Sequence, residues 1–378
     1  MDVLDRQNLG QARRIVVKVG TAVLTRSDGR LALTRMAHLV EQIGDLLTDG
    51  RQVLLVSSGA VGIGVERLGL SGTPTRLVER QACAAVGQGA LVSTYNDFLE
   101  RLGHVGAQVL LTEDDFSDRG RYVNLQHTLE RLLSLGVLPI LNENDTVSTA
   151  ELEITEGSVF GDNDRLSALL ASRMEADLLV LLSDVEGVYT QPPGAEGAEV
   201  VEVFAPSTEV VLGAGSARGR GGMQSKIEAA RVANLAGVAV VVASGVEANT
   251  LRRVAQGDVV GTFFPPDRQS NSRKRWLRFA TTARGRLVVN SGARQALEDR
   301  KASLLPSGVV GVEGEWSAGE VVDIADETGA DFARGMANCS STDARSSMGC
   351  HSKELGSSRG DRCLVHSENL AMLQEVGS

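Results

Sequence analysis

The feature that most constrains the fold is a repeated alternation, over residues 14–243, of short apolar runs with longer amphipathic stretches. The apolar runs have the length of single buried strands, and the stretches between them carry apolar residues at helical spacing. This alternation favours right-handed crossovers, and therefore an α/β three-layer sandwich whose central sheet is mainly parallel. The expected strands are 14–19, 53–56, 107–111, 137–141, 177–182 and 238–243, and the expected helices are 34–49, 76–101, 124–135, 165–174 and 223–237.

The pattern changes after Phe264, where two prolines and a basic stretch indicate a linker over residues 265–282. We therefore expect one domain over residues 1–264 and a small β-rich domain over residues 283–370. The tail after about residue 367 is weakly patterned. The expected strands of the second domain are short apolar segments between glycines, at 287–289, 308–312 and 320–324.

Charge and cysteine content limit the classes of function. Residues 273–378 carry 14 basic and 14 acidic side chains, so residues 1–272 carry the whole net charge of −10. This balance argues against non-specific nucleic-acid binding, and we do not expect the second domain to bind RNA. Four cysteines in 378 residues suggest a reducing compartment. No apolar run approaches the ~20 residues of a membrane span, so we expect a cytoplasmic protein without a membrane partner.

Two polar quartets flank one expected strand-to-helix crossover. Residues 142–145 (Asn-Glu-Asn-Asp) follow the strand 137–141, and residues 161–164 (Gly-Asp-Asn-Asp) precede the next helix, with Asp164 as its expected N-cap. One such quartet would indicate only a turn, because Asn and Asp favour turns. Two of them place carboxylates and amides at the carboxyl edge of a sheet, where open α/β folds bind ligands.

Lysine is scarce: the chain has five lysines against 33 arginines. Lys18 lies inside an otherwise apolar strand, where a buried ammonium group needs an anionic partner. Lys226 lies in the first turn of a helix that follows a glycine-rich loop, and such a helix N-terminus presents backbone N–H groups to an anion. Each lysine alone is compatible with a structural ion pair, whereas together they point to phosphate binding.

Several familiar motifs are missing. The chain has neither the P-loop pattern nor GxGxxG, although the glycine-containing stretch 59–64 follows a strand and could hold a carboxylate. We interpret the histidines at 38, 104 and 127 as structural or surface residues. Two histidines and three cysteines gather near the C-terminus with spacings that fit no zinc pattern, namely Cys339, Cys350, His351, Cys363 and His366.

The motifs together resemble one family over nearly the whole chain. From about residue 14 to about residue 370, the sequence resembles the glutamate 5-kinases, which belong to the amino acid kinase family and carry a C-terminal PUA domain. The matching stretches are 16–21 (Val-Val-Lys-Val-Gly-Thr), 57–60 (Ser-Ser-Gly-Ala), the quartets 142–145 and 161–164, 221–226 (Gly-Gly-Met-Gln-Ser-Lys), 303–308 (Ser-Leu-Leu-Pro-Ser-Gly) and 319–322 (Gly-Glu-Val-Val).

The resemblance implies an activity and a set of site residues. ATP would phosphorylate the side-chain carboxylate of L-glutamate, Lys18 and Lys226 would flank the transferred group, and Asp164 would orient both lysines. Glutamate would bind at Ser58, Asp145 and Asn163, with backbone N–H groups at Ser58 and Gly59 suited to an anionic end. The ATP-binding residues would be Lys18, Ser183, Asp184, Arg220, Gly221, Gly222, Met223, Gln224, Ser225 and Lys226.

The resemblance also implies partners. Mg²⁺ would be held by ATP oxygens and water rather than by a side-chain cage, so we expect no dedicated metal ligands. Proline would inhibit the enzyme by feedback, the protein would be a homo-oligomer, and its product would be channelled to the next enzyme of the pathway. Two alternatives remain. One is a related kinase acting on acetylglutamate, aspartate or carbamate, and the other is an RNA-binding or regulatory protein with a silent kinase fold.

Overall fold

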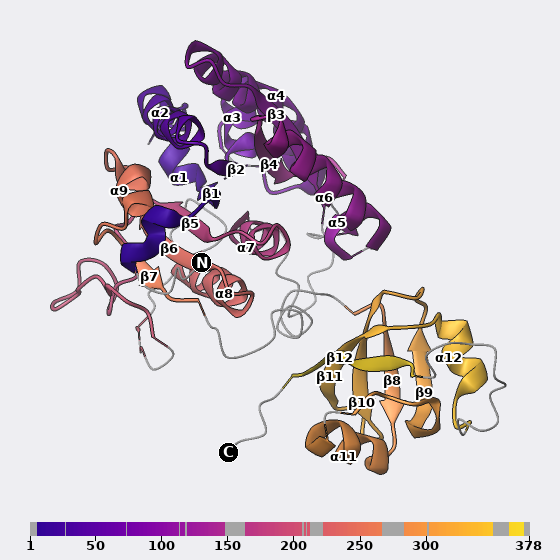
Figure 1. Ribbon diagram of the computed structural model, residues 1–378. Coiled ribbons are helices and arrows are strands. Elements are labelled where there is room, and N and C mark those ends of the chain that lie inside the picture. The colour runs from indigo at the N-terminus through magenta and orange to yellow at the C-terminus, as the bar shows by residue number, and fades with distance from the viewer. Residues whose placement is uncertain are drawn as a thin grey trace. The chain divides into compact units, whose positions relative to one another are not determined.

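In the computed structural model, the chain forms two compact units, each with its own sheet (Figure 1). The first unit consists of residues 1–113 and 124–267, and the second of residues 114–123 and 268–378. The structure describes residues 6–26, 28–72, 74–112, 114–117, 119–147, 163–205, 208, 210–211, 222–266, 283–300, 302–350 and 363–373.

A seven-stranded sheet forms the centre of the first unit, with the strand order β3-β4-β2-β1-β5-β6-β7. All neighbouring strands run parallel except β6 and β7, which are antiparallel. Its strands are β1 (Arg14–Val19), β2 (Gln52–Ser57), β3 (Gly106–Leu111), β4 (Leu138–Glu143), β5 (Leu178–Ser183), β6 (Ala239–Ser244) and β7 (Thr262–Phe264). The predicted mainly parallel sheet is thus confirmed, and only the short antiparallel edge strand β7 was not expected.

The helices that the alternation predicted are present in the structure. The predicted helices correspond to α2 (Leu33–Thr48), α4 (Leu77–Arg101), α6 (Arg119–Ser134), α7 (Asn163–Arg173) and α8 (Met223–Leu235). The structure adds short elements, which are η1 (Arg6–Gln11), α1 (Thr21–Leu24), α3 (Ala60–Arg67), α5 (Asp114–Ser117) and α9 (Thr250–Gln256).

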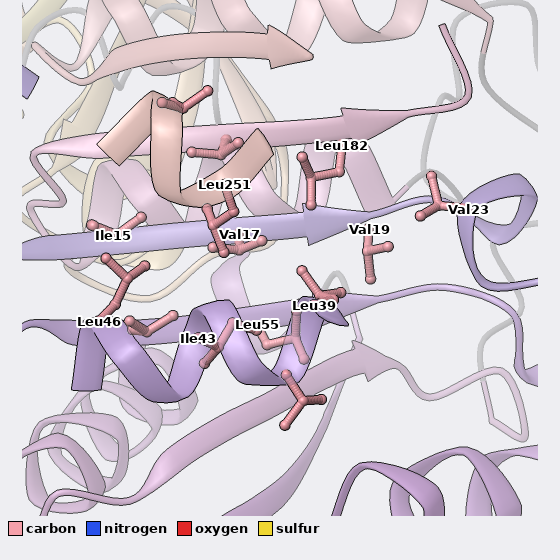
Figure 2. Close-up of a cluster of buried hydrophobic side chains, with 14 of the residues drawn as sticks. Ile15, Val17, Val19, Val23, Leu39, Ile43, Leu46, Leu55, Leu182 and Leu251 are labelled. Atoms are coloured by element: carbon pink, nitrogen blue, oxygen red, sulfur yellow. The ribbon is translucent and has the colours of Figure 1, made fainter. Parts of the chain in front are cut away.

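The residues of β1 divide between the two faces of the sheet. Ile15, Val17 and Val19 belong to a large apolar cluster, and Figure 2 shows them beside side chains of α2 such as Leu39 and Ile43. Because successive side chains of a strand point to opposite faces, Lys18 faces away from this cluster. The helix α7 packs against β1 and also against α8, and it carries the buried Asp164 that pairs with Lys18. The strand therefore directs its one cation out of the aliphatic core.

The glycines of residues 59–64 are part of the packing between α3 and α4. A Cβ atom on Gly64 would lie 1.8 Å from the Cys83 carbonyl oxygen, and one on Gly87 would lie 1.8 Å from the Ala60 carbonyl oxygen. Such distances are far inside van der Waals contact, so both positions require glycine. Gly59 precedes α3 with φ +106°, a left-handed conformation that glycine adopts readily. The helices therefore cross at their backbones, and most of this stretch is α3 rather than a loop.

The second unit contains a five-stranded sheet in the order β12-β11-β10-β8-β9. Its three predicted strands are present as β8, β9 and β10. The strands β11 and β12 were not predicted, and most of β12 lies in the weakly patterned tail after about residue 367. The elements are β8 (Gly285–Val289), α11 (Ser291–Arg300), η2 (Pro306–Gly308), β9 (Val309–Gly314), β10 (Val321–Asp326), β11 (Asp331–Ala337), α12 (Ser341–Ser347) and β12 (Val365–Met372). None of the helices in the described ranges combines the length and the apolar character that crossing a membrane would need.

Candidate functional site

A buried cluster of three charged side chains lies on one face of the central sheet. The Lys18 Nζ atom lies 2.5 Å from Asp164 Oδ1, and the Lys226 Nζ atom lies 3.1 Å from Asp164 Oδ2. The Asp164 side chain is fully buried, and the two lysine side chains are only 5% and 9% exposed. The three residues come from β1, α7 and α8, so the fold unites positions that are more than 200 residues apart in the sequence.

The electrostatics of this cluster keep Asp164 ionised. Burial alone would raise the pKa of the Asp164 carboxyl group, but the charges and hydrogen bonds of Lys18 and Lys226 lower it below its ordinary value. Two ammonium groups and one carboxylate carry a net charge of +1. Burying an excess positive charge costs free energy unless an anion shares the site. The cluster is therefore complementary to an anionic ligand.

Asp164 lies inside its helix and not at the N-cap position that we predicted. We expected it as the N-cap of the helix, but α7 already begins at Asn163 and Asp164 lies in its first turn. Its carboxylate is consequently not used for capping and instead accepts hydrogen bonds from Lys226 Nζ and, at 2.9 Å, from Ser225 Oγ. Ser225 and Lys226 both belong to the first turn of α8, so one carboxylate joins the N-terminal ends of α7 and α8.

A chain of amide hydrogen bonds extends from this cluster towards β2 and β4. Asn163 Nδ2 donates to Ser58 Oγ at 2.8 Å and to Asn142 Oδ1 at 2.9 Å. Asn142 Nδ2 in turn donates to Gln88 Oε1 at 2.8 Å, and both of these side chains are buried. The Asn163 Oδ1 atom is also buried and has no hydrogen-bond partner among the described residues. An unpaired buried acceptor is costly, which indicates that a donor group of a ligand belongs there.

The expected role of the Ser58 backbone needs correction. The Ser58 N–H group donates to the Val19 carbonyl oxygen at 3.1 Å, so it is already used within the fold. The Ser58 hydroxyl group remains part of the site through Asn163. An anionic end of a ligand would therefore meet the Ser58 side chain and not its backbone N–H.

Asp145 lies in a polar cluster beyond the end of β4. Burial is the largest influence on its carboxyl group, followed by the nearby charge of Glu143, and together they raise the Asp145 pKa to about 6. The guanidinium group of Arg80, on α4, opposes the rise. Two acidic groups held close to one cation leave net negative charge, which is complementary to a ligand's ammonium group.

Polar residues also follow β5. Ser183 is buried at the end of the strand and donates from Oγ to Asp184 Oδ1 at 3.2 Å, whereas Asp184 is exposed. Gly222 precedes α8 as its N-cap residue, followed by Met223 and the exposed Gln224. The expected ATP-binding residues Arg220 and Gly221 lie outside the described residues. The predicted site residues that the structure describes thus lie at or near the carboxyl ends of β4, β2, β1 and β5 and at the first turns of α7 and α8.

Sequence reasoning missed the residues that support this edge from α4. Gln88 and Arg80 sit in a stretch identified only as helical, and Glu143 and Asn142 were treated as members of a quartet without separate roles. The available signal for Gln88 was a long polar side chain within the apolar stripe of a helix. Such a side chain, when buried, requires a hydrogen-bonding partner.

Comparisons with known proteins identify the family of the chain. Residues 13–244 match the model of the amino acid kinase family, and residues 285–357 match that of the PUA domain. The chain is 45% identical to glutamate 5-kinase from Moorella thermoacetica over 377 residues, covering 97% of this chain and 98% of the relative. It is 43% identical to glutamate 5-kinase from Caldanaerobacter subterraneus over 370 residues (96% and 98%) and 45% identical to that from Myxococcus xanthus over 379 residues (97% and 98%). The chain therefore belongs to the glutamate 5-kinase group of the amino acid kinase family and carries a PUA domain.

Proposed function

We propose that this protein transfers the γ-phosphoryl group of ATP to the side-chain carboxylate of L-glutamate. The products are ADP and L-glutamyl 5-phosphate, and the reaction is the first step of proline biosynthesis. The observation that carries the proposal is the buried Lys18–Asp164–Lys226 cluster with its net positive charge. The names of the relatives support glutamate as the acceptor.

The strand order supports a division of the edge into an acceptor side and a donor side. Because β1 lies between β2 and β5, Lys18 stands between the polar groups after β2 and β4 and those after β5. The chain leaves β1 towards β2 and leaves β5 towards β6, so β1 and β5 meet where the strand order reverses. Ligands of open α/β sheets bind at such reversals. Glutamate then occupies the side of β2 and β4, ATP occupies the side of β5 and α8, and the lysines lie between them.

The reaction needs charge stabilisation more than proton transfer. The attacking carboxylate of glutamate is already ionised at neutral pH, so no general base is required. Phosphoryl transfer depends on alignment of the two oxygens and on neutralising charge on the transferred group. Lys18 and Lys226 supply two cations, and Asp164 fixes the position of both ammonium groups. Asp164 acts in this scheme as a positioning residue for the lysines.

Glutamate recognition is assigned to the acceptor side. Asp145, with Glu143 beside it, provides the negative charge for the substrate's α-ammonium group. Asn163 offers its unpaired Oδ1 acceptor, and Ser58 offers its hydroxyl group. The hydrogen bonds from Asn163 to Ser58 and Asn142 hold this acceptor in place, so the substrate meets a rigid set of polar atoms.

ATP-dependent kinases commonly use Mg²⁺, and the donor set here does not fit a side-chain cage for it. Among the described residues, no three acidic, histidine or cysteine side chains gather as metal ligands. Asp164, the buried carboxylate of the lysine cluster, is engaged by two ammonium groups and a hydroxyl group. Mg²⁺ would accordingly arrive with ATP, held by phosphate oxygens and water.

The proposal includes a domain division and regulation. Residues 1–264 form the kinase domain, residues 265–282 a linker, and residues 283–370 the PUA-like domain. Proline shares the α-carboxylate and the cationic nitrogen of glutamate but lacks the reactive carboxylate, so it inhibits by occupying part of the acceptor side. The protein acts as a homo-oligomer and passes its product directly to the next enzyme, which protects a labile acyl phosphate from water.

An assay of ADP release against a panel of acceptors tests the proposed function. L-glutamate should support ATP-dependent turnover, whereas N-acetylglutamate, aspartate and carbamate should support far less. The acyl phosphate can be trapped with hydroxylamine, which shows that the acceptor is a carboxylate. The Lys226→Met variant is the negative control for contaminating kinases. Preference for another acceptor would assign the protein to a related kinase, and no turnover with any acceptor would favour the silent-kinase alternative.

A further inference from the structure

The second unit contains a pair of cysteines that the kinase reaction does not use. We propose that Cys339 and Cys363 are a modification site, a cross-strand dithiol that closes to an intramolecular disulfide by exchange with a low-molecular-weight disulfide such as oxidised glutathione. The inference does not depend on the proposed function, because the phosphoryl-transfer lysines belong to the other unit.

The last pair of the β11–β12 ladder brings the two cysteines into one neighbourhood. Ala337, the last residue of β11, pairs with Val365, the first residue of β12, in antiparallel orientation. The Asn338 N–H donates to the Leu364 carbonyl oxygen at 2.8 Å, which closes this pair. Cys339 and Cys363 each lie two residues beyond it, one on each chain. We infer that their Cα atoms lie within the range of about 4.4–6.8 Å that a disulfide requires.

The side-chain surroundings agree with this placement. Asn338 Nδ2 contacts Cys363 twice, at 3.1 Å from its carbonyl oxygen and at 3.3 Å from its Sγ atom. The Cys339 carbonyl oxygen accepts a hydrogen bond from Trp316 Nε1 at 3.1 Å. Cys339 also packs against the apolar core of this unit, to which Leu364 belongs. Cys339 is thus held against the apolar core, and Cys363 is held by Asn338, the neighbour of Cys339 in the sequence.

The surroundings of Cys339 disfavour its thiolate. Burial raises the pKa of the Cys339 thiol above its ordinary value, and the nearby Asp343 carboxylate and Cys363 thiol raise it further. Since the attacking species in thiol–disulfide exchange is the thiolate, Cys339 reacts slowly at neutral pH. Closure is therefore a response to sustained oxidising conditions, and the dithiol is the resting form in a reducing compartment.

The small disulfide is the oxidant in this exchange. Cys339, the more exposed of the pair, loses its proton, and its thiolate attacks one sulfur of the small disulfide and releases a small thiolate. Cys363 then loses its proton, and its thiolate attacks the Cys339 sulfur of the mixed disulfide and releases the second small thiolate. The two protons are taken up by the departing thiolates. The protein loses two hydrogens, and one small disulfide is reduced to two thiols.

Closure would fasten the start of β12 to the end of β11. The register of this strand pair shifts between Gly335 and Ala337, so regular pairing is interrupted just before the cysteines. A covalent link at this place fixes the last strand of the sheet where its hydrogen bonding is least regular. The loop that it closes contains α12 and the third cysteine of the unit, Cys350.

The sequence offers a direct test, because trypsin separates the cysteines. Cleavage at arginine and lysine places Cys339 in peptide 335–345, Cys350 in peptide 346–353 and Cys363 in peptide 363–378. The native, full-length protein is incubated with a series of reduced and oxidised glutathione mixtures, quenched with a thiol-blocking reagent and digested. We expect one linked pair, 335–345 with 363–378, and a fall in free thiols from four to two.

Matched variants distinguish the outcomes. Cys350→Ser should keep the link, whereas Cys339→Ser and Cys363→Ser should abolish it and leave a mixed disulfide on the remaining partner. The linkage map of the wild-type protein decides the question even if a variant folds poorly. Glutathione attached separately to the three cysteines, or a link through peptide 346–353 in place of 363–378, would overturn the proposal. So would three unmodified peptides at the most oxidising mixture.

Discussion

Ion pairs in the two units of this molecule differ in what surrounds them. In the first unit, Lys18 and Lys226 share the fully buried carboxylate of Asp164. In the second unit, Arg286 pairs with Asp331 at 2.8 Å, and these side chains are 37% and 30% exposed. The distances are alike, whereas the access of water to the charges is not.

This difference in exposure implies a difference in the free-energy cost of holding the charges in the folded protein. Exposed ion pairs lose little hydration and contribute little to stability. A buried cluster with unequal charge loses hydration that its internal attraction does not fully recover. An anionic ligand would offset this cost, and the ligand that we propose is the phosphoryl group. Variants of the two kinds of pair should consequently affect different properties, with activity most sensitive in the first unit.

The largest effect is expected from removing either lysine. Lys18→Met or Lys226→Met should lower kcat by roughly a hundredfold or more, comparable to losing one preorganised donor to developing charge. Methionine suits the apolar surroundings, and one lysine still neutralises Asp164, so the fold should persist. Steady-state ADP release, with circular dichroism as the check on folding, measures the effect. Arg252→Met, which alters an exposed pair with Asp45, is the matched control. Near-normal turnover in both lysine variants would contradict the assignment.

The next effect in size concerns the acceptor side. Asp145→Asn should raise KM for glutamate about ten- to a hundredfold, because hydrogen bonds to charged groups contribute roughly 1.5–3 kcal/mol. KM for ATP should stay nearly constant, and the proline concentration for half-inhibition should rise. Titrations of glutamate, ATP and proline on both proteins measure these changes. If KM for glutamate rises but the proline concentration for half-inhibition does not, glutamate and proline do not share this carboxylate. If neither of these two quantities changes, Asp145 is a structural turn residue.

If Asp145 binds the substrate's ammonium group as proposed, its raised pKa should make glutamate binding depend on pH. The carboxyl group is mostly ionised at pH 7 and becomes protonated as the pH falls through about 6. KM for glutamate should then rise, approaching tenfold per pH unit, while the side-chain carboxyl of free glutamate, with a pKa of about 4.3, stays ionised. Initial rates between pH 5 and pH 8 measure the profile.

Two variants sharpen this pH test. Asp145→Asn should flatten the dependence of KM on pH because it removes the titrating group. Arg80→Gln removes the cation that lowers the Asp145 pKa, so the rise in KM should begin at a higher pH. A wild-type profile that is flat down to pH 5 would show that Asp145 does not bind the ammonium group.

Sequence predicted the first unit better than the second for a physical reason. Parallel strands buried on both faces are continuous apolar runs, so β1 and β5 were placed within one residue of their observed bounds. In the second unit, β11 mixes Asp, Arg and Gly with apolar residues, and β12 contains His, Ser and Glu. Half-buried strands with a register shift lack a clear alternation, and both were missed.

The candidate site was predictable only in part. Lys18 could be identified because an isolated cation in an apolar strand needs an anionic partner, and Lys226 because it begins a helix after a glycine-rich loop. The resemblance implied that Asp164 orients both lysines. The pairing itself joins three distant segments, and no local pattern encodes such a contact. The partner of Gln88 could not be predicted for the same reason, since Asn142 lies 54 positions away in the sequence.

The smallest effect should come from the exposed pair of the second unit. Arg286→Gln removes its contact with Asp331 and the longer one, at 3.5 Å, with Glu313. Because these side chains are 30–60% exposed, the free energy of unfolding should fall by about 1 kcal/mol or less. Turnover of ATP and KM for glutamate should stay within about twofold of the wild-type values, since no kinase side chain is altered. Thermal unfolding followed by circular dichroism, together with the ADP-release assay, measures both quantities. A loss of activity as large as that of Lys18→Met, with the unfolding midpoint unchanged, would mean that the second unit contributes directly to catalysis, and the contrast between the two kinds of ion pair would no longer locate the active site.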